Sequence, residues 1–288
     1  MLNARMASVG RGCSPGMLRA RLRVRYAGVA LVAVSICASA CGPKRIELPT
    51  DPGTPLPDYA SIHSQVTSGC STVRSLSAEV SLSGRANGER LRGTLHAGFR
   101  KPAAMYLEFR APLSGSPMFV LVANGSAATL VLPRDNQVVR GPKGEDILGA
   151  LTGIALSPDD LLAILTGCVI PEPRATGGRL HANGWASIEL DGRATLYLQR
   201  AGSTWRLRAA QRGEWRIEYV EWSETATFPS RVQLSAARPA VVALSASLAQ
   251  MESNVDLPDD TFVAKVPANA EVLSLDDIRR SGPLKDQP

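Results

Sequence analysis

Histidines and carboxylates are the residues of this chain that could carry acid–base or metal chemistry. The histidines, His63, His96 and His181, lie far apart in the sequence, and none has the spacing of metal ligands. Asp159 and Asp160 are adjacent, but both fall in the first turn of a predicted helix, where the helix dipole accounts for them. The sequence contains no GxSxG motif, glycine-rich phosphate loop or CxxC motif. We therefore expect no catalytic residue, no metal site, no cofactor and no enzyme activity.

The cysteines are the other candidates for covalent chemistry, and the chain has five of them. Cys13 and Cys37 lie in the N-terminal leader. Cys41 directly follows the small residues Ala38-Ser39-Ala40. This run resembles the bacterial lipobox, in which signal peptidase cuts before the cysteine and the thiol is acylated. The alternative is ordinary cleavage after Ala40, which would leave Cys41 as a free thiol.

Cys70 and Cys168 remain after the leader is removed, an even pair in an exported protein. A disulfide between them would close a loop of roughly 100 residues and stabilise the fold by a few kcal/mol. The alternative is two buried free thiols.

The leader explains the net charge of +6. Its first forty residues contain six arginines and no acid, and the apolar run Ala27–Ala40 is too short to span a bilayer. Residues 1–40 are therefore predicted to be a lipoprotein signal peptide, which starts at Met1 or Met17. Removing the six arginines leaves 26 basic residues against 26 acidic ones, so the chain has no electrostatic footprint for nucleic acid.

The element around which the chain is organised is Glu145–Cys168, which predicts two short helices broken at Thr152-Gly153. The second helix begins with Ser157 as N-cap and Pro158 in the first helical position, and it ends at Gly167. The apolar stripe of both helices must be buried. A helical plug lying in a curved antiparallel sheet with an apolar hollow satisfies this requirement. Helices that merely cap a packed core satisfy it equally.

Alternating apolar and polar residues predict a mainly β (α+β) fold, a curved antiparallel half-barrel of about eleven strands in one meander. Tight turns are predicted at Asn87-Gly88, Asn124-Gly125, Asp191-Gly192 and Arg212-Gly213.

The remaining segments complete the predicted organisation. Residues 41–57 are a Pro-rich tether, residues 58–267 are one half-barrel domain, and residues 268–288 are a C-terminal tail. The domain is expected to begin with a helix from Asp58 to about Ser75, interrupted near Gly69. We also expect a loop at Pro171–Gly178, an edge strand at Thr261–Val266 and a weak helix at Leu275–Arg280.

Three segments resemble the LolA/LolB family of lipoprotein carriers and receptors. Met105–Asn124 is similar to the strand, Asn-Pro-Leu-Gly loop and strand of LolB. Gly149–Gly167 is similar to the family segment G-K-L-T-G-x-x-x-P-x-x-x-L, and Gly213–Leu234 to its G-x-x-W-x-V-x-Y and later strands. The resemblance covers about Leu76–Met251, and the chain beyond Met251 has no counterpart.

The resemblance implies a half-open barrel lidded by helices around a hydrophobic cavity. It implies a receptor that takes acylated lipoproteins from a LolA-like periplasmic carrier and places them in the outer membrane. Leu113 corresponds to the leucine of the family's protruding loop, which is important for membrane insertion. From the residues alone, a single exposed leucine is ordinary.

We therefore expect a monomeric, lipid-anchored protein of the bacterial cell envelope that binds acyl chains, acts as a LolB-like receptor and faces the periplasm from the outer membrane. Gly42 favours outer-membrane sorting because it is not the Asp that retains lipoproteins at the inner membrane of some bacteria. The alternative is a structural or sensor-type envelope lipoprotein whose sheet interior is filled by its own side chains. The residues expected to line the cavity are Leu95, Phe99, Met105, Leu107, Phe119, Leu121, Leu130, Ile147, Leu151, Leu161 and Leu165.

Overall fold

The computed structural model describes residues 45–281, apart from 114–115, 126, 142, 169–173, 193, 223–227 and 237–241. The chain divides after Arg45, and the unit that starts at Ile46 is described here by itself. The predicted signal peptide, Cys41 and the end of the predicted tail lie outside the described residues.

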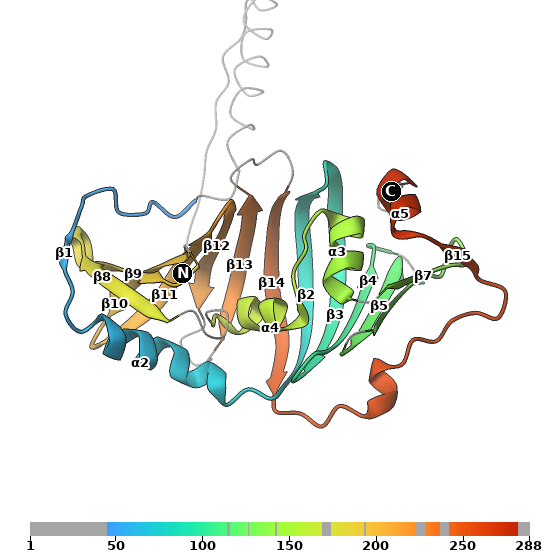
Figure 1. Ribbon diagram of the computed structural model, residues 1–288, viewed down its shortest axis with the longest axis horizontal. Coiled ribbons are helices and arrows are strands. Elements are labelled where there is room, and N and C mark those ends of the chain that lie inside the picture. Colours follow the sequence, from blue (N-terminus) through green and yellow to red (C-terminus); the bar gives the residue numbers. More distant parts are fainter. Residues whose placement is uncertain are drawn as a thin grey trace, which may run out of the picture. The chain divides into compact units, whose positions relative to one another are not determined.

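The described residues form a single open, curved sheet of fifteen strands, with short helices packed against it (Figure 1). The strands are β1 (Thr54–Pro55), β2 (Ser75–Ala86), β3 (Glu89–Arg100), β4 (Ala104–Arg110), β5 (Phe119–Asn124), β6 (Ala127–Leu132), β7 (Gln137–Gly141), β8 (Ala175–Leu180), β9 (Trp185–Leu190), β10 (Ala194–Ala201), β11 (Thr204–Arg212), β12 (Trp215–Trp222), β13 (Pro229–Ala236), β14 (Val242–Ser253) and β15 (Glu271–Leu273).

The strand order differs from the predicted single meander. The order across the sheet is β1-β8-β9-β10-β11-β12-β13-β14-β2-β3-β4-β5-β6-β7-β15. Two antiparallel meanders, β2–β7 and β8–β14, are thus joined side by side where β14 pairs with β2. The prediction of about eleven strands was too low because β1, β8 and β15 are short or glycine-containing pairings at the outer parts of the sheet, without a clear alternating pattern.

Local sequence accounts for the hairpins inside each meander. Asn87 and Gly88 both have positive φ, which a two-residue hairpin turn requires, and Ala86 pairs directly with Glu89. The pairings of Asn124 with Ala127 and of Arg212 with Trp215 confirm two more predicted hairpins, but each turn lies one residue later than predicted.

The described helices are α2 (Tyr59–Ser71), α3 (Gly144–Thr152), α4 (Pro158–Thr166) and α5 (Leu275–Ser281), with short 3₁₀ turns η2 (Ala182–Gly184) and η3 (Asp259–Phe262). Helix α2 runs through Gly69 without the predicted interruption. No described helix is long and apolar enough to cross a membrane.

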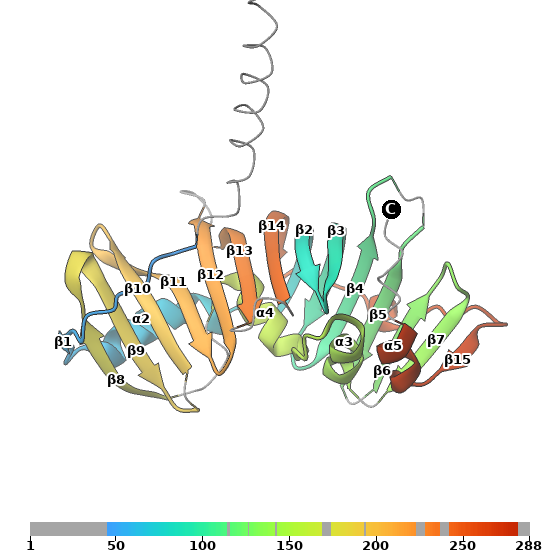
Figure 2. The same cartoon turned by 90° about the horizontal axis from the view of Figure 1, so that it is seen from above.

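The sheet has two main apolar cores on its helix-covered face. The first core packs strands β2–β7 against α3, α4 and α5, and its fully buried members include Phe109, Leu121 and Ile147. The second core packs strands β9–β13 against α2 and against Ile164 of α4, around the buried Tyr219. Figure 2 shows α4 between the two groups of strands.

Both ends of the described chain are attached to the sheet, contrary to the predicted tether and tail. In the stretch predicted as a tether, Thr54–Pro55 pairs with β8, and Leu56 packs on the second core. In the predicted tail, β15 pairs in parallel with β7, and Ile278 of α5 is completely buried in the first core. The predicted helix near Leu275 is confirmed.

Two other predicted segments were wrong. The expected edge strand at Thr261–Val266 is replaced by η3, whose Phe262 packs on Ala104 and Val122. The predicted Pro/Gly loop at Pro171–Gly178 contains the start of β8, since its glycines accept strand geometry beside β9.

Candidate functional site

Helices α3 and α4 form a hairpin, called here the lid, and their local sequence fixes where each begins and ends. Glu145 and Asp146 lie in the first turn of α3, which stops at Gly153 with φ 76°. Ser157 caps α4, and Asp160 completes a capping box by accepting a hydrogen bond from the Ser157 backbone N–H. The two predicted helices and their break are thus confirmed.

An apolar pocket of about 120 Å³ lies between the lid and the sheet, at the junction of the two meanders. Strands β2–β5, β13 and β14 form one wall, and both lid helices and their linker form the other. The residues that line the pocket are Val80, Leu82, Leu91, Leu95, Phe99, Leu107, Phe109, Phe119, Leu148, Thr152, Ile154, Leu156, Leu161, Ile164, Leu165, Val232, Leu234, Leu244 and Ala246.

The described residues of the lining offer no free polar group to a ligand. Thr152 is the only polar residue among them, and its hydroxyl donates to the Leu148 carbonyl at 2.8 Å and accepts from the Ile154 N–H at 3.2 Å. None of the described lining residues is charged. Such a surface favours hydrocarbon, because an unpaired polar group would lose its hydration without compensation.

The pocket reaches solvent through half-buried residues. Leu82, Leu95, Leu156, Leu161, Leu234, Leu244 and Ala246 all line it and are only partly buried. The remaining lining residues are buried. The pocket is therefore an open groove at its edge and a closed cavity at its floor.

Six of the eleven residues predicted to line a cavity line this pocket: Leu95, Phe99, Leu107, Phe119, Leu161 and Leu165. The other five lie instead in the closed packing of the first core: Met105, Leu121, Leu130, Ile147 and Leu151. Their exposures are 2% or less. Met105, Leu121 and Leu130 face the lid side as expected, but α5 and α3, which carries Ile147 and Leu151, fill the space above them.

Several lining residues were not predicted. Leu244 and Ala246 reach the pocket because β14 pairs with β2, a contact between segments about 160 residues apart that no local pattern reveals. Val80 and Leu82 alternate along β2, so their orientation was visible in the sequence.

The second end of the lid is covalently attached. Cys168 follows α4, and the structure joins it by a disulfide to Cys70 in α2, 98 residues earlier, with Cα atoms 5.7 Å apart. The buried Tyr219 hydroxyl donates to the Cys168 carbonyl at 3.5 Å, and burial raises the pKa of Tyr219. The disulfide thus links the lid to the helix that covers the second core.

Leu113 lies in the loop between β4 and β5, far out of the packed cores. Its relative exposure is 108%, and its φ is 61°, in the left-handed region that bulky residues rarely adopt. Ala111 and Met118, at the two ends of this loop, are buried and hold its base. The loop therefore presents one apolar side chain entirely to the surroundings.

The three histidines lie far apart in the part of the chain that the structure describes, and His181 bonds both a carboxylate and a hydroxyl. His63 lies in α2, His96 in β3, and His181 beside β8, where it bonds Asp51 at 3.2 Å and Ser187 at 2.8 Å. No group of three potential metal ligands occurs among the described residues.

No family model and no curated protein matches this chain. Among solved structures, a LolA superfamily protein from Nitrosomonas europaea is 12% identical, with a TM-score of 0.48, covering 73% of this chain and 98% of its own. A domain from Vibrio parahaemolyticus described as an outer membrane lipoprotein-sorting protein is 9% identical, with a TM-score of 0.47, covering 71% and 94%. The Mycobacterium tuberculosis lipoprotein LppX is 11% identical, with a TM-score of 0.31, covering 70% and 99%.

Because the three TM-scores lie below 0.5 and the identities are 12% or lower, these similarities decide neither the fold family nor the function of this chain. The function must follow from the pocket, the lid and the loop of this chain.

Proposed function

We propose that this chain is a lipid-anchored protein of the bacterial cell envelope that binds acyl chains in the apolar pocket and acts as a LolB-like receptor. It would take acylated lipoproteins from a LolA-like periplasmic carrier and deliver them to the outer membrane. The observation that carries the proposal is the open apolar groove beneath the lid, where Thr152, the only polar residue among the described lining residues, is hydrogen-bonded internally.

Burial of hydrocarbon supplies the binding free energy in this proposal. Each acyl methylene removed from water contributes about 0.8 kcal/mol. The groove offers no partner for a charge, so the polar end of the ligand stays outside. No cofactor and no catalytic step are needed, because transfer runs downhill if the receptor binds the chain more tightly than the carrier.

The lid must move for a whole acyl chain to enter. At about 120 Å³ the pocket is close in size to engineered apolar cavities that hold one benzene ring, and smaller than the usual ligand pocket. The linker from Gly153 to Ser157 contributes Ile154 and Leu156 to the lining, so rotation about this linker would widen the groove.

Leu113 supplies the membrane contact in this proposal. Leu113 is fully exposed and has left-handed backbone geometry, so it destabilises the fold without gaining apolar contacts. This combination points to a role in binding something outside the folded chain. We assign it to insertion into the bilayer interface during transfer. Cys41, outside the described residues, would carry the acyl anchor, since two or more acyl chains suffice for stable attachment.

A fluorescent fatty-acid probe tests the binding site directly. Ala246 is half-buried and lines the groove, whereas Ala249, on the same strand, is exposed and does not line it. Ala246→Trp should abolish stoichiometric probe binding by filling the groove, and Ala249→Trp should leave it unchanged. Equal binding by both variants would contradict the assignment of the groove.

Liposome transfer of an acylated cargo tests the role of Leu113. Leu113→Glu should leave the thermal midpoint and probe binding near wild type, because exposed loop substitutions rarely change stability by more than about 0.5 kcal/mol. Cargo transfer should fall sharply, since a carboxylate opposes entry into hydrocarbon. Unchanged transfer would remove the support for a LolB-like mechanism while leaving acyl binding in place.

The anchor is tested by Cys41→Ser. The variant should appear in the soluble envelope fraction without the mass of acyl chains. Membrane attachment with the leader retained would contradict lipidation at this residue.

The second candidate is a structural envelope lipoprotein with a filled interior. The close packing of Met105, Leu121, Leu130, Ile147 and Leu151 favours it, because the part of the first core around these residues is filled. It predicts that wild-type protein takes up no probe at any concentration below that at which the probe forms micelles.

A further inference from the structure

Two arginines face each other on the outer surface of the β2–β3 hairpin. In the strand register, Arg85 of β2 lies directly opposite Arg90 of β3, two residues from the turn at Asn87-Gly88. Both side chains are exposed. We call these two residues the arginine pair.

The register also shows which face of the sheet carries the pair. Leu82 and Leu91 line the pocket, and Gly84 lies opposite Leu91. Because side chains alternate along a strand, Arg85 and Arg90 point to the opposite face, away from the lid. The arginine pair therefore plays no part in closing the groove.

Among the described residues, no ion pair offsets the repulsion between these two arginines. Like charges directly opposite each other on neighbouring strands destabilise a sheet. Within the part of the chain that the structure describes, neither Arg85 nor Arg90 makes an ion pair or a side-chain hydrogen bond. By contrast, Arg110 on β4 is bonded to Glu108 at 2.5 Å.

The arginine pair and Leu113 lie at the same rim of the sheet. Arg110, the last residue of β4, pairs with Thr94, so both the β2–β3 turn and the β4–β5 loop extend beyond this point in the same direction. The two hairpins are neighbours in the sheet (Figure 2). An unpaired cationic site and a fully exposed leucine thus occupy one edge.

We propose that this rim is a membrane-docking edge, in which Arg85 and Arg90 bind the phosphate groups of anionic phospholipids while Leu113 enters the hydrocarbon. A guanidinium binds phosphate oxygens through two parallel hydrogen bonds, and an anionic bilayer supplies many phosphates in one plane. Basic and acidic residues balance outside the leader, so the attraction belongs to this edge and not to the net charge. The part played by Leu113 rests on the proposed function, and the part played by the arginine pair does not.

Sedimentation with vesicles tests the arginine pair. The protein is the chain from residue 41 onward with Cys41→Ser, which removes the anchor and keeps the folded unit from Ile46. Vesicles are phosphatidylcholine alone or mixed with phosphatidylglycerol, at low and at physiological salt. At low salt, Arg85→Gln with Arg90→Gln should weaken binding to the anionic vesicles about 25-fold, from about fivefold per arginine. Binding to neutral vesicles should change less than about twofold.

The matched control removes two cations from the opposite rim. Arg74 and Lys101 are exposed where β2 begins and where β3 ends. Arg74→Gln with Lys101→Gln should leave binding within about twofold of wild type. Arg85→Lys with Arg90→Lys should restore most of the binding to anionic vesicles, because lysine and arginine contribute alike to the charge attraction, and the remaining loss would report the bidentate hydrogen bonds. Thermal midpoints of all variants should match or exceed that of wild type.

Two outcomes would overturn the docking edge. One is equal binding by the arginine-pair variant and its control, and the other is an equal loss on neutral and anionic vesicles. Leu113→Glu in the same assay separates this proposal from the proposed function, since it should weaken binding to both kinds of vesicle. If only Leu113→Glu weakens binding, the role proposed for the arginine pair is wrong and the membrane contact of Leu113 stands. If only the arginine-pair variant weakens binding, the membrane contact of Leu113 is wrong.

Discussion

The β2–β7 half of the sheet and the β8–β14 half are built alike but closed differently. In the first half, α3 and the C-terminal α5 cover a tightly filled core through apolar packing alone. In the second half, α2 covers the core, and a disulfide from Cys70 holds it to the lid at Cys168. Helix α4 contributes to both cores, through Leu162 and Leu165 on one side and Ile164 on the other.

Between the halves lies a seam where neither core is complete. We define the seam by Leu156, Leu234, Leu244, Ala246 and Leu248, which are all partly buried and pack against one core or both. All but Leu248 also line the pocket. The groove therefore lies between two packed cores that do not contact each other fully, and it is not the interior of a uniformly open barrel.

The comparison would be sharpened most by matched leucine truncations in the core and in the seam. Leu130 is completely buried in the first half, whereas Leu244 is half-buried beside the pocket. Leu130→Ala should lower the free energy of unfolding by about 2–5 kcal/mol, because it leaves a new cavity. Leu244→Ala should cost only about 1 kcal/mol, since part of the side chain already faces space or solvent. Urea unfolding measures both, and equal losses would show that the seam is as closed as the core.

Removing the disulfide should have the next largest effect. Cys70→Ser with Cys168→Ser opens a loop of 98 residues and should lower the free energy of unfolding by about 2–4 kcal/mol. Reduction of the wild-type protein should produce the same shift in the urea midpoint. Ready alkylation of both thiols in the folded, unreduced protein would contradict the covalent closure of the second half.

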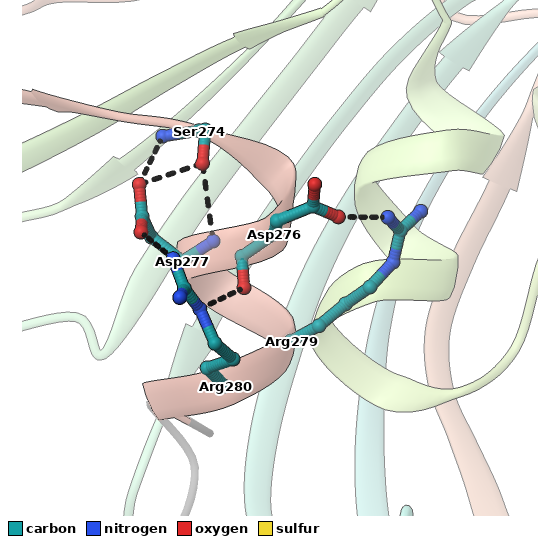
Figure 3. Close-up of polar contacts among 5 residues, drawn as sticks. All are labelled: Ser274, Asp276, Asp277, Arg279 and Arg280. Carbon is teal, nitrogen blue, oxygen red and sulfur yellow. Dashed lines mark hydrogen bonds and ion pairs between the residues drawn. The ribbon is translucent and has the colours of Figure 1, made fainter.

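Undocking α5 tests the non-covalent closure of the first half. Ser274 and Asp277 form a capping box at the start of α5, and Asp276 pairs with Arg279 on its exposed side (Figure 3). Ile278 is completely buried in the first core. Ile278→Asp should detach α5 from the first core, because burying the carboxylate would cost more than undocking the helix. The free energy of unfolding should therefore fall only by the contribution of α5 packing, about 1.5–3 kcal/mol.

Hydrogen exchange should then rise in α3, which packs against α5. Arg279→Ala is the control, since it changes the exposed face of the same helix and should cost little. A loss of protection that spreads equally over α2 would contradict independent closure of the halves.

The sequence predicted the parts of this molecule that local chemistry determines. The lid followed from Ser157, Pro158 and the glycines at 153 and 167, since caps and helix stops act within a few residues. The alternation of apolar and polar residues predicted which face of the sheet carries Phe99 and Leu107. Such local patterns predict the orientation of a side chain, but not which element packs against it.

The seam and the attached chain ends depend on pairings between distant segments. Nothing near Leu244 indicates that β14 will join β2, and nothing in the parallel edge strand β15 indicates that it will pair with β7. Met105 and Leu130 were predicted to line a cavity because their facing is right. Only the docking of α3 and α5 shows that the space above them is filled.

The smallest expected effect distinguishes the halves by pH. His63 lies in α2, above the second core, and its buried Nε2 atom has no hydrogen-bond partner among the described residues. Burial lowers the pKa of His63 below its ordinary value of 6.5, because no neighbouring group compensates the charge. The unfolded chain therefore takes up a proton at higher pH than the folded chain does. The free energy of unfolding should fall as the pH drops through 6.5 and level off once the folded chain is protonated too.

Since the His63 side chain is partly solvated, this loss of stability should be less than about 1 kcal/mol. His63→Gln should flatten this pH dependence in thermal unfolding. In the wild-type protein, the first loss of hydrogen-exchange protection on acidification should be confined to α2. An unchanged pH profile in His63→Gln would show that another group governs the acid response of the second half.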